Sequence, residues 1–229
     1  MKAQERLHAA HLAAREGRHE EALAEYVWFH EHALQEQPSL YGVRLSFALS
    51  YWVELSKDHP PALQALRDIR DRKARTLESG NPDRELFHDV EAINQYLGQS
   101  GDTARLFQLL ERQNPAFAGR CASLAMEALA EAGQFELASK YLPEPVPHIT
   151  KLAAHLSDDV ARIPDRPRSK APRYRAFTWN FAQYLRLFMS VLSGAGRQSE
   201  ALACREAAFS TMKPWYVRRA VERALAGDA

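Results

Sequence analysis

The sequence predicts an all-α protein, and three observations support that prediction. Apolar residues recur with the helical period, as at Leu86, Val90 and Ile93 and again over 185–192. No segment alternates between apolar and polar residues as a half-buried strand does, and neither Asn-Gly nor Asp-Gly hairpin turns occur. Ala, Leu, Glu, Gln and Arg, which all favour helices, are abundant.

Glycine and proline residues divide the chain into successive helices. Gly17 and Pro38 bound one helix, and the prolines at 60 and 61 separate the next two, because proline is tolerated in the first turn of a helix and not in its interior. Further breaks follow at 80–83, 100–102, 114–115 and 133. The expected helices with defined ends cover about 18–36, 39–57, 61–78, 148–162 and 214–226. The short gaps favour neighbouring helices packed as hairpins.

A proline-rich region interrupts this pattern. Three prolines lie within 143–147 and three more within 164–172. We expect a short, loosely attached helix over 148–162 and a linker over 163–173 that acts as a mobile loop or a hinge. The expected organisation is helical hairpins over 1–142, a short helix and basic linker over 143–173, and a C-terminal hairpin with a capping helix over 174–229, together forming one continuous domain.

Length and composition exclude several classes of protein. With 229 residues, 46% of them hydrophobic, the chain is long enough to bury a core and is not disordered throughout. Its two cysteines form no disulfide framework. No apolar run approaches the roughly 18 residues that a membrane span requires, and the first residues lack the pattern of a signal peptide. We therefore expect a soluble cytoplasmic protein.

The charge is unevenly distributed along the chain. Residues 1–160 have a net charge of −7, from 17 basic and 24 acidic residues, whereas residues 161–229 have +8, from 13 basic and 5 acidic residues. Such a division can mark an interaction surface, or it can reflect attraction between the two halves or between two copies of the chain. Self-association is therefore one of the expectations.

Four glycines have similar sequence surroundings, since each follows an apolar helix and precedes one rich in small residues. They are Gly17, Gly101, Gly133 and Gly196, separated by 84, 32 and 63 residues. Five residues after three of them stands an alanine, namely Ala22, Ala138 and Ala201. A period near 34 residues is typical of helical repeat proteins.

These features resemble the tetratricopeptide repeat, in which a glycine ends the first helix and a small residue lets the second approach closely. Leu97, Leu129 and Leu192 occupy the apolar position four residues before the glycine, and Tyr26 and Leu142 match the large residue after the alanine. The resemblance implies stacked hairpins that form an α-solenoid. The usual aromatic near the start of the first helix is missing, and 39–79 lacks the glycine, so an irregular α-bundle is the alternative.

The resemblance also implies that the first helices of the pairs line a concave groove. Counting back from each glycine gives its expected lining: His11, His88, Glu91, Gln95, Arg120, Ser123, Glu127, Gln183, Arg186 and Ser190. A polar groove of mixed sign suits an extended peptide or the charged tail of a protein partner. The alternative is that these are the solvent-facing positions of amphipathic helices.

No sequence motif points to catalysis. The nine histidines form no His-Glu-x-x-His motif, and neither they nor the cysteines cluster with the spacing of metal ligands. There is no Gly-x-Ser-x-Gly motif, and the Gly194–Gly196 segment follows a helix rather than a strand, which argues against a phosphate loop. We expect a protein-binding module, with no enzymatic activity, catalytic residue, metal or cofactor.

Nucleic acid is the alternative ligand. A basic segment precedes three aromatic residues, Tyr174, Phe177 and Trp179. Its cations are Arg162, Arg166, Arg168, Lys170, Arg173 and Arg175. Basic residues neutralise phosphates and aromatic rings stack on unpaired bases, although the acidic residues 1–160 would repel a polyanion. The segment can equally be a solvated linker, and a dedicated regulator of one enzyme or toxin is a third possibility by analogy with other helical repeat proteins.

Overall fold

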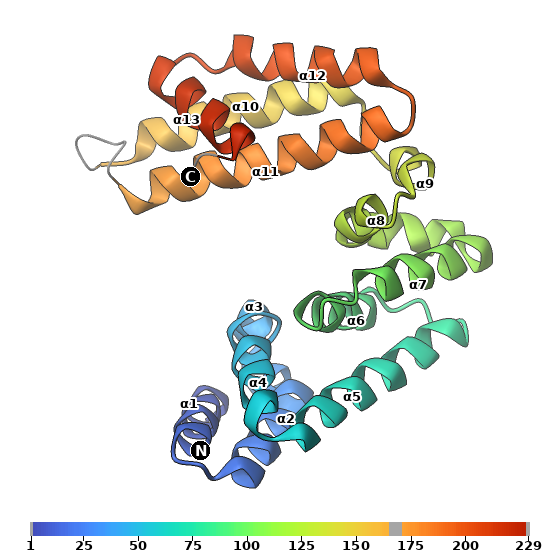
Figure 1. Ribbon diagram of the computed structural model, residues 1–229, viewed down its shortest axis with the longest axis vertical. Coiled ribbons are helices and arrows are strands. Elements are labelled where there is room, and N and C mark those ends of the chain that lie inside the picture. Colours follow the sequence, from blue (N-terminus) through green and yellow to red (C-terminus); the bar gives the residue numbers. More distant parts are fainter. Residues whose placement is uncertain (1, 165–170, 228–229) are drawn as a thin grey trace. The chain divides into compact units, whose positions relative to one another are not determined.

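The computed structural model describes residues 2–164 and 171–227, which contain helices and no strand (Figure 1). The predicted all-α class is confirmed for these residues. The chain divides into two compact units, unit 1 (Met1–Ala128) and unit 2 (Leu129–Ala229). The division falls within a helix, whereas the sequence pattern places boundaries at 142 and 173. None of the described helices combines the length and apolar character that a membrane crossing needs.

Unit 1 is a series of helices, and buried residues between Ala3 and Ile93 form one apolar core. Its elements are α1 (Ala3–Arg15), α2 (His19–Glu36), a 3-10 turn (Pro38–Leu40), α3 (Tyr41–Arg44), α4 (Phe47–Asp58), α5 (Pro60–Glu78), α6 (Arg84–Tyr96), α7 (Ser100–Gln113) and α8 (Pro115–Glu131), which continues into unit 2. The helix α1 packs on α2, α2 on α4, and α5 on α6. Tyr26, Phe29 and Trp52 are fully buried in the core.

The prediction of one helix over 39–57 is wrong, because the chain breaks after α3. Ser46 adopts φ −125° and ψ −91°, and its hydroxyl donates a hydrogen bond to the Gly42 carbonyl at 2.7 Å. A serine side chain that bonds to the backbone competes with continued helix formation. The short α3 ends at Arg44, whose side chain is buried.

Four turns between paired helices share one geometry. The glycines at 17, 98, 133 and 196 have φ between 65° and 78°, which favours glycine. In each turn the next N–H donates to the carbonyl five residues back, as Gln99 does to Asn94 at 2.8 Å. The prediction that Gly101 forms one of these turns is therefore wrong. Gly98 lies in the turn between α6 and α7, and Gly101 lies in the first turn of α7.

Aligning the turn on Gly98 changes which side chains pack across the helix pair. The residue five positions later is Thr103, which is as fully buried as Ala22, Ala138 and Ala201. The residue four positions before Gly98 is Asn94, also fully buried. The side-chain amide nitrogen of Asn94 donates to the Thr103 hydroxyl at 3.0 Å, and its side-chain oxygen Oδ1 accepts from Arg70 at 3.0 Å. A hydrogen-bonded pair thus replaces the apolar residue and alanine of the other turns.

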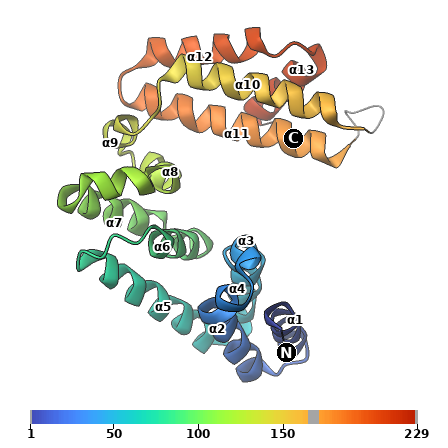
Figure 2. The same cartoon turned by 180° about the vertical axis from the view of Figure 1, so that it is seen from behind.

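Unit 2 consists of α9 (Phe135–Lys140), α10 (Pro145–Arg162), α11 (Pro172–Gly194), α12 (Gln198–Thr211) and α13 (Trp215–Ala226). The prediction that the helix after the first proline cluster is loosely attached is wrong, because α10 lies between α11 and α12 (Figure 2). Ile149, Ala153 and Val160 of α10 are fully buried. The first turn of α10 accommodates Pro145 and Pro147. Of the predicted linker 163–173, residues 165–170 lie outside the described residues.

A close contact fixes α9 against α11. A Cβ atom added at Gly194 would lie 2.2 Å from Cγ of the Phe135 ring, well inside van der Waals contact. Because Cγ is the atom by which the ring is attached, a small rotation of Phe135 would not relieve the overlap. Gly194, whose φ is ordinary, is therefore required for space rather than for backbone conformation.

Candidate functional site

The exposed stripe of α6 is the starting point of the candidate site. Asp83 begins this helix by accepting hydrogen bonds from the N–H groups of Glu85 and Leu86 at 2.8 and 3.1 Å. Most of α6 is buried against its neighbours, including Phe87 and Ile93. The accessible positions with helical spacing are Arg84, His88, Glu91 and Gln95. Three of these four are predicted groove residues.

A second exposed stripe, on α8, lies beside the first. It consists of Arg120, Ser123 and Glu127, which are all predicted groove residues. Arg84 Nε donates to the Arg120 carbonyl at 2.8 Å, and the Glu127 carboxylate acts electrostatically on Glu91. Both pairs are separated by 36 residues, so α6 and α8 run in parallel. We refer to the two stripes together as the α6–α8 face.

Two carboxylates on the α6–α8 face lie near each other, and no described Lys or Arg forms an ion pair with either of them. Burial raises the pKa of Glu91 to about 7, and the charge of Glu127 raises it further. The nearest basic group in an ion-pair geometry is His88, with Nε2 3.9 Å from the Glu91 carboxylate. Burial lowers the pKa of His88, so its imidazole is neutral at pH 7. Ionisation of Glu91 therefore costs free energy, and a cation placed beside its carboxylate would offset that cost.

Tyr41 of α3 forms an aromatic edge to this face. Its hydroxyl lies 2.8 Å from Nδ1 of His88, and the two rings are 5.5 Å apart. Burial raises the pKa of Tyr41, which therefore stays protonated near neutral pH. Both side chains are half-buried, so they present a mixed aromatic and polar surface.

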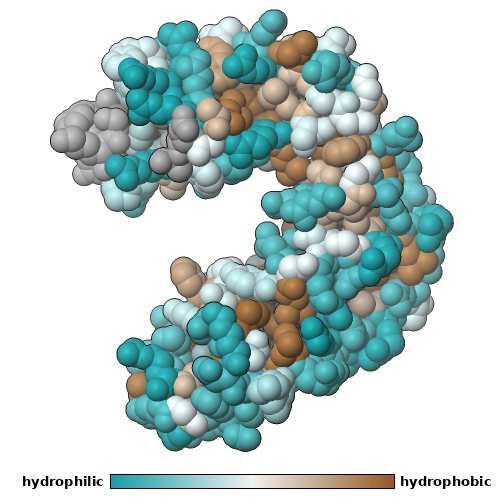
Figure 3. Space-filling model, in the orientation of Figure 1, coloured by the Kyte–Doolittle hydropathy of each residue, from teal (hydrophilic) through white to brown (hydrophobic). Residues whose placement is uncertain are grey.

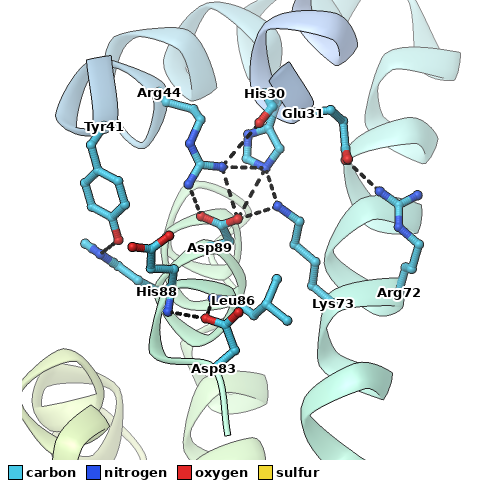
Figure 4. Close-up of polar contacts among 11 residues, drawn as sticks. His30, Glu31, Tyr41, Arg44, Arg72, Lys73, Asp83, Leu86, His88 and Asp89 are labelled. Atoms are coloured by element: carbon cyan, nitrogen blue, oxygen red, sulfur yellow. Dashed lines mark hydrogen bonds and ion pairs between the residues drawn. The ribbon is translucent and has the colours of Figure 1, made fainter. Parts of the chain in front are cut away.

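A buried ionic cluster lies beneath the face (Figure 4). The Asp89 carboxylate is 3% exposed and accepts hydrogen bonds from Arg44, with Nη1 3.0 Å from Oδ2, and from Lys73. Burial alone would raise the pKa of Asp89, but the hydrogen bond from Arg44 and the charges of Lys73 and Arg44 hold it below its ordinary value. Both carboxylate oxygens of Asp89 therefore have a cationic partner. Since Arg44 lies on α3, Lys73 on α5 and Asp89 on α6, the cluster connects these three helices.

His30 of α2 completes the cluster. Arg44 Nη1 and Lys73 Nζ lie 3.3 and 3.1 Å from His30 Nε2. Burial, followed by the charges of Lys73 and Arg44, lowers the pKa of His30 to about 3, so the ring is neutral and accepts from the two cations. The cluster therefore carries two positive charges and one negative charge.

None of the four members of this cluster is among the site residues predicted from the sequence. One signal was present. Asp89 follows Leu86 by three residues and precedes Ile93 by four, which places a carboxylate on the apolar face of its helix. A charge at such a position needs buried partners. Those partners come from residues 30, 44 and 73, and nothing in the local pattern identifies them.

The remaining predicted groove residues are engaged elsewhere within their own units. His11 on α1 stacks on Tyr51 with ring centres 4.3 Å apart. On α11, Arg186 donates to the carbonyls of Ala224 and Leu225 at 2.5 and 3.0 Å, which caps the end of α13. Arg186 also donates to the side chain of Gln183 at 2.9 Å. Ser190 is exposed and donates to the Leu187 carbonyl.

The predicted basic segment is only partly described. Arg162 ends α10 and lies 3.6 Å from the Asp159 carboxylate, whereas Arg173 and Arg175 are exposed at the start of α11. Arg166, Arg168 and Lys170 lie outside the described residues.

Unit 2 also has an apolar groove between α10 and α11. It has a volume of about 500 Å³ and is lined mainly by aromatic and aliphatic side chains. At one end His148 stacks on Phe188, and its Nε2 lies 2.8 Å from the Tyr184 hydroxyl. At the other end stands Asp159, the partner of Arg162.

The described residues contain no group of three or more His, Cys, Asp or Glu side chains arranged to hold a metal ion. The two cysteines, Cys121 and Cys204, are free and buried, and burial raises the pKa of both thiols. A high pKa leaves little reactive thiolate at neutral pH.

Comparison with known proteins found no match to this chain among protein-family models, among curated proteins or among solved structures. The resemblance to tetratricopeptide repeats therefore rests on the turns and helix pairs described above.

Proposed function

We propose that this chain is a non-catalytic protein-binding module that holds an extended segment of a partner protein on the α6–α8 face. We further propose that its helix pairs belong to a tetratricopeptide-like solenoid. The four equivalent glycine turns and the parallel packing of α6 and α8, one repeat length apart, support this view. Six predicted groove residues, three on each helix, contribute to the same surface.

The unpaired carboxylates carry the proposal. Glu91 is partly desolvated beside Glu127, so a partner's lysine or arginine placed between them would supply the missing countercharge. Arg84 and Arg120 lie toward the other end of the face, where they favour a carboxylate. Tyr41 and His88 offer a half-buried aromatic edge for an apolar side chain. We therefore expect a bound segment with a basic residue on one side and an acidic residue on the other.

A peptide-display selection tests this proposal. The full chain would be used to select peptides at pH 7.5, and each peptide would then be titrated by fluorescence anisotropy against the Glu91→Gln/Glu127→Gln variant. We expect the peptides to be enriched in Lys or Arg and to bind the variant at least about 10-fold more weakly, equivalent to the loss of one charge-assisted pair.

The matched control is Glu20→Gln/Glu78→Gln, which removes two exposed carboxylates from α2 and α5. It should leave the affinity unchanged. Equal binding of a selected peptide to the wild type and to the Glu91→Gln/Glu127→Gln variant would show that the face does not bind it. Enrichment of peptides without basic residues would contradict the proposed recognition.

A further inference from the structure

The starts of α11 and α13 meet at one end of unit 2. The Tyr174 hydroxyl donates to the Tyr216 carbonyl at 2.8 Å, and their ring centres are 6.0 Å apart. Further along both helices, Arg186 donates to the carbonyl of Leu225. Because these contacts occur in the same order along each helix, α11 and α13 run in parallel, with their N-termini at the same end (Figure 1).

Each of these helices presents a stripe of arginine and tryptophan beside this contact. On α13 the residues 215, 219 and 223, spaced by four, are Trp215, Arg219 and Arg223, and on α11 the stripe is Arg175 and Trp179. All five side chains are exposed, Trp215 by 66% and Trp179 by 42%. The opposite side of α13, which includes Val217 and Val221, is buried in the core.

The end of the α13 stripe at Arg223 lies near α11. Burial raises the pKa of Tyr174, while the charge of Arg223 opposes the rise, so Arg223 lies near the Tyr174 phenol. On the α13 helix, Arg223 also follows Tyr216 by seven residues, and Tyr216 contacts α11. The α13 stripe therefore adjoins the helix that carries Arg175 and Trp179, and we refer to the two stripes together as the α11–α13 face.

The segment from α11 to α13 carries an excess of positive charge. Between residues 171 and 227 there are nine basic residues and three acidic ones, and one of the three, Glu200, is paired with Arg197. No cation of the two stripes forms an ion pair with a described residue, and no stripe position is acidic. The N-termini of both helices add partial positive charge. In Figure 3 the surface over the start of α13 is strongly hydrophilic.

We propose that this α11–α13 face binds single-stranded nucleic acid. Arg175, Arg219 and Arg223 contact successive phosphates, and the indoles of Trp179 and Trp215 stack on unpaired bases. Alternation of cations with flat aromatic rings at one-turn spacing fits a strand whose charges and bases alternate. An anionic membrane would require an insertable aliphatic patch, and the stripes contain none. The site lies in unit 2 and is separate from the α6–α8 face.

The test is the binding of a fluorescein-labelled 15-nucleotide oligo-dT, followed by anisotropy from 50 to 300 mM salt. We expect the logarithm of the affinity to fall linearly with the logarithm of salt concentration, by about 0.7 for each phosphate contacted. The Arg219→Gln/Arg223→Gln variant should bind at least about 10-fold more weakly at 100 mM salt and lower the slope by about 1.4. The Trp215→Ala variant should weaken binding by a similar factor and leave the slope unchanged, because stacking releases no counterions.

The matched control is Arg75→Gln/Arg112→Gln, which removes two exposed arginines from α5 and α7 in unit 1. It should bind like the wild type. Equal losses in both double variants would indicate a general charge effect and overturn the assignment. The absence of oligo-dT binding at 50 mM salt would do the same, as would binding only to phosphatidylserine vesicles. Since peptide binding is measured on the other unit, either proposal can fail while the other holds.

Discussion

The two units differ in what their cores contain. Among the described residues, unit 1 buries six polar or charged side chains, His30, Arg44, His59, Asp89, Asn94 and Thr103. Unit 2 buries Thr178, whose hydroxyl donates to the Tyr174 carbonyl within its own helix. Directional bonds between helices therefore hold unit 1 in register, whereas unit 2 depends on the fit of apolar surfaces. The comparison shows that one chain can specify helix packing in two ways, each with its own weak point.

The largest expected effect comes from removing the centre of the unit 1 cluster. Asp89→Asn leaves Arg44 and Lys73 buried without a negative charge, so we expect a loss of about 3–5 kcal/mol in the free energy of unfolding. Urea denaturation measures the loss, and hydrogen exchange should locate it in unit 1. The exposed Asp58→Asn is the control. A loss below about 1 kcal/mol would mean that Arg44 and Lys73 do not need the charge of Asp89 to remain buried.

Acid should weaken unit 1 more than unit 2. The pKa of His30 is lowered from 6.5 to about 3, so the unfolded chain binds a proton that the folded unit does not. The stability that this provides is complete above pH 6.5 and is lost as the pH falls toward 3, at up to about 1.4 kcal/mol per pH unit. Asp89, whose pKa is also lowered, adds a loss below its unfolded value near 3.8.

Hydrogen exchange of both units between pH 7 and pH 4 checks this expectation, and His30→Gln, which keeps an acceptor and cannot titrate, should flatten the unit 1 curve. Burial and Lys151 lower the pKa of His148 in unit 2, but that side chain is less buried, so its effect should be smaller. Equal acid sensitivity of the two units would contradict the contrast between their cores.

The weak point of unit 2 is steric. Gly194→Ala places a methyl group against the Phe135 ring and should cost about 1–3 kcal/mol by overpacking. Gly42→Ala is a matched control, because nothing lies within 4 Å of its added Cβ and its φ is not positive. Thermal melts of the two variants measure the difference. Neutral behaviour of Gly194→Ala would show that α9 moves freely against α11.

The smallest effect concerns the α6–α8 face. Glu91 has a pKa raised to about 7, so its ionisation costs stability as the pH rises from 4.5 through 7. Glu91→Gln should therefore stabilise unit 1 by about 1–2 kcal/mol at pH 8 and leave it almost unchanged at about pH 4, below the ordinary pKa of a glutamate. Glu20→Gln is the exposed control. Stabilisation of the same size at about pH 4 would point to packing rather than to charge.

Features set by nearby residues could be predicted, and those set by distant ones could not. The helical period gives the all-α class, and proline and glycine give most helix ends. The choice of Gly101 over Gly98 failed because both glycines fit a turn, and only the hydrogen bond from Gln99 to Asn94 distinguishes them. The break at Ser46 coincides with a side-chain hydrogen bond to the Gly42 carbonyl, which the helical pattern does not reveal.

The candidate site shows the same limit. Counting along each helix correctly placed His88 and Glu91 on one accessible stripe and Arg120 and Glu127 on another. Counting does not show that the stripes adjoin, which depends on how α6 and α8 pack. The α11–α13 face likewise joins residues about 40 positions apart, through the contact of Tyr174 with Tyr216.

The two buried cysteines give each unit its own internal reporter. Cys121 lies in unit 1 and Cys204 in unit 2, and both are fully enclosed and unpaired. A thiol reagent can reach either sulfur only when the helices around it separate. The rate at which each cysteine is alkylated in the natural protein, read by mass spectrometry, therefore measures the opening of one half of the molecule independently of the other, with no introduced label.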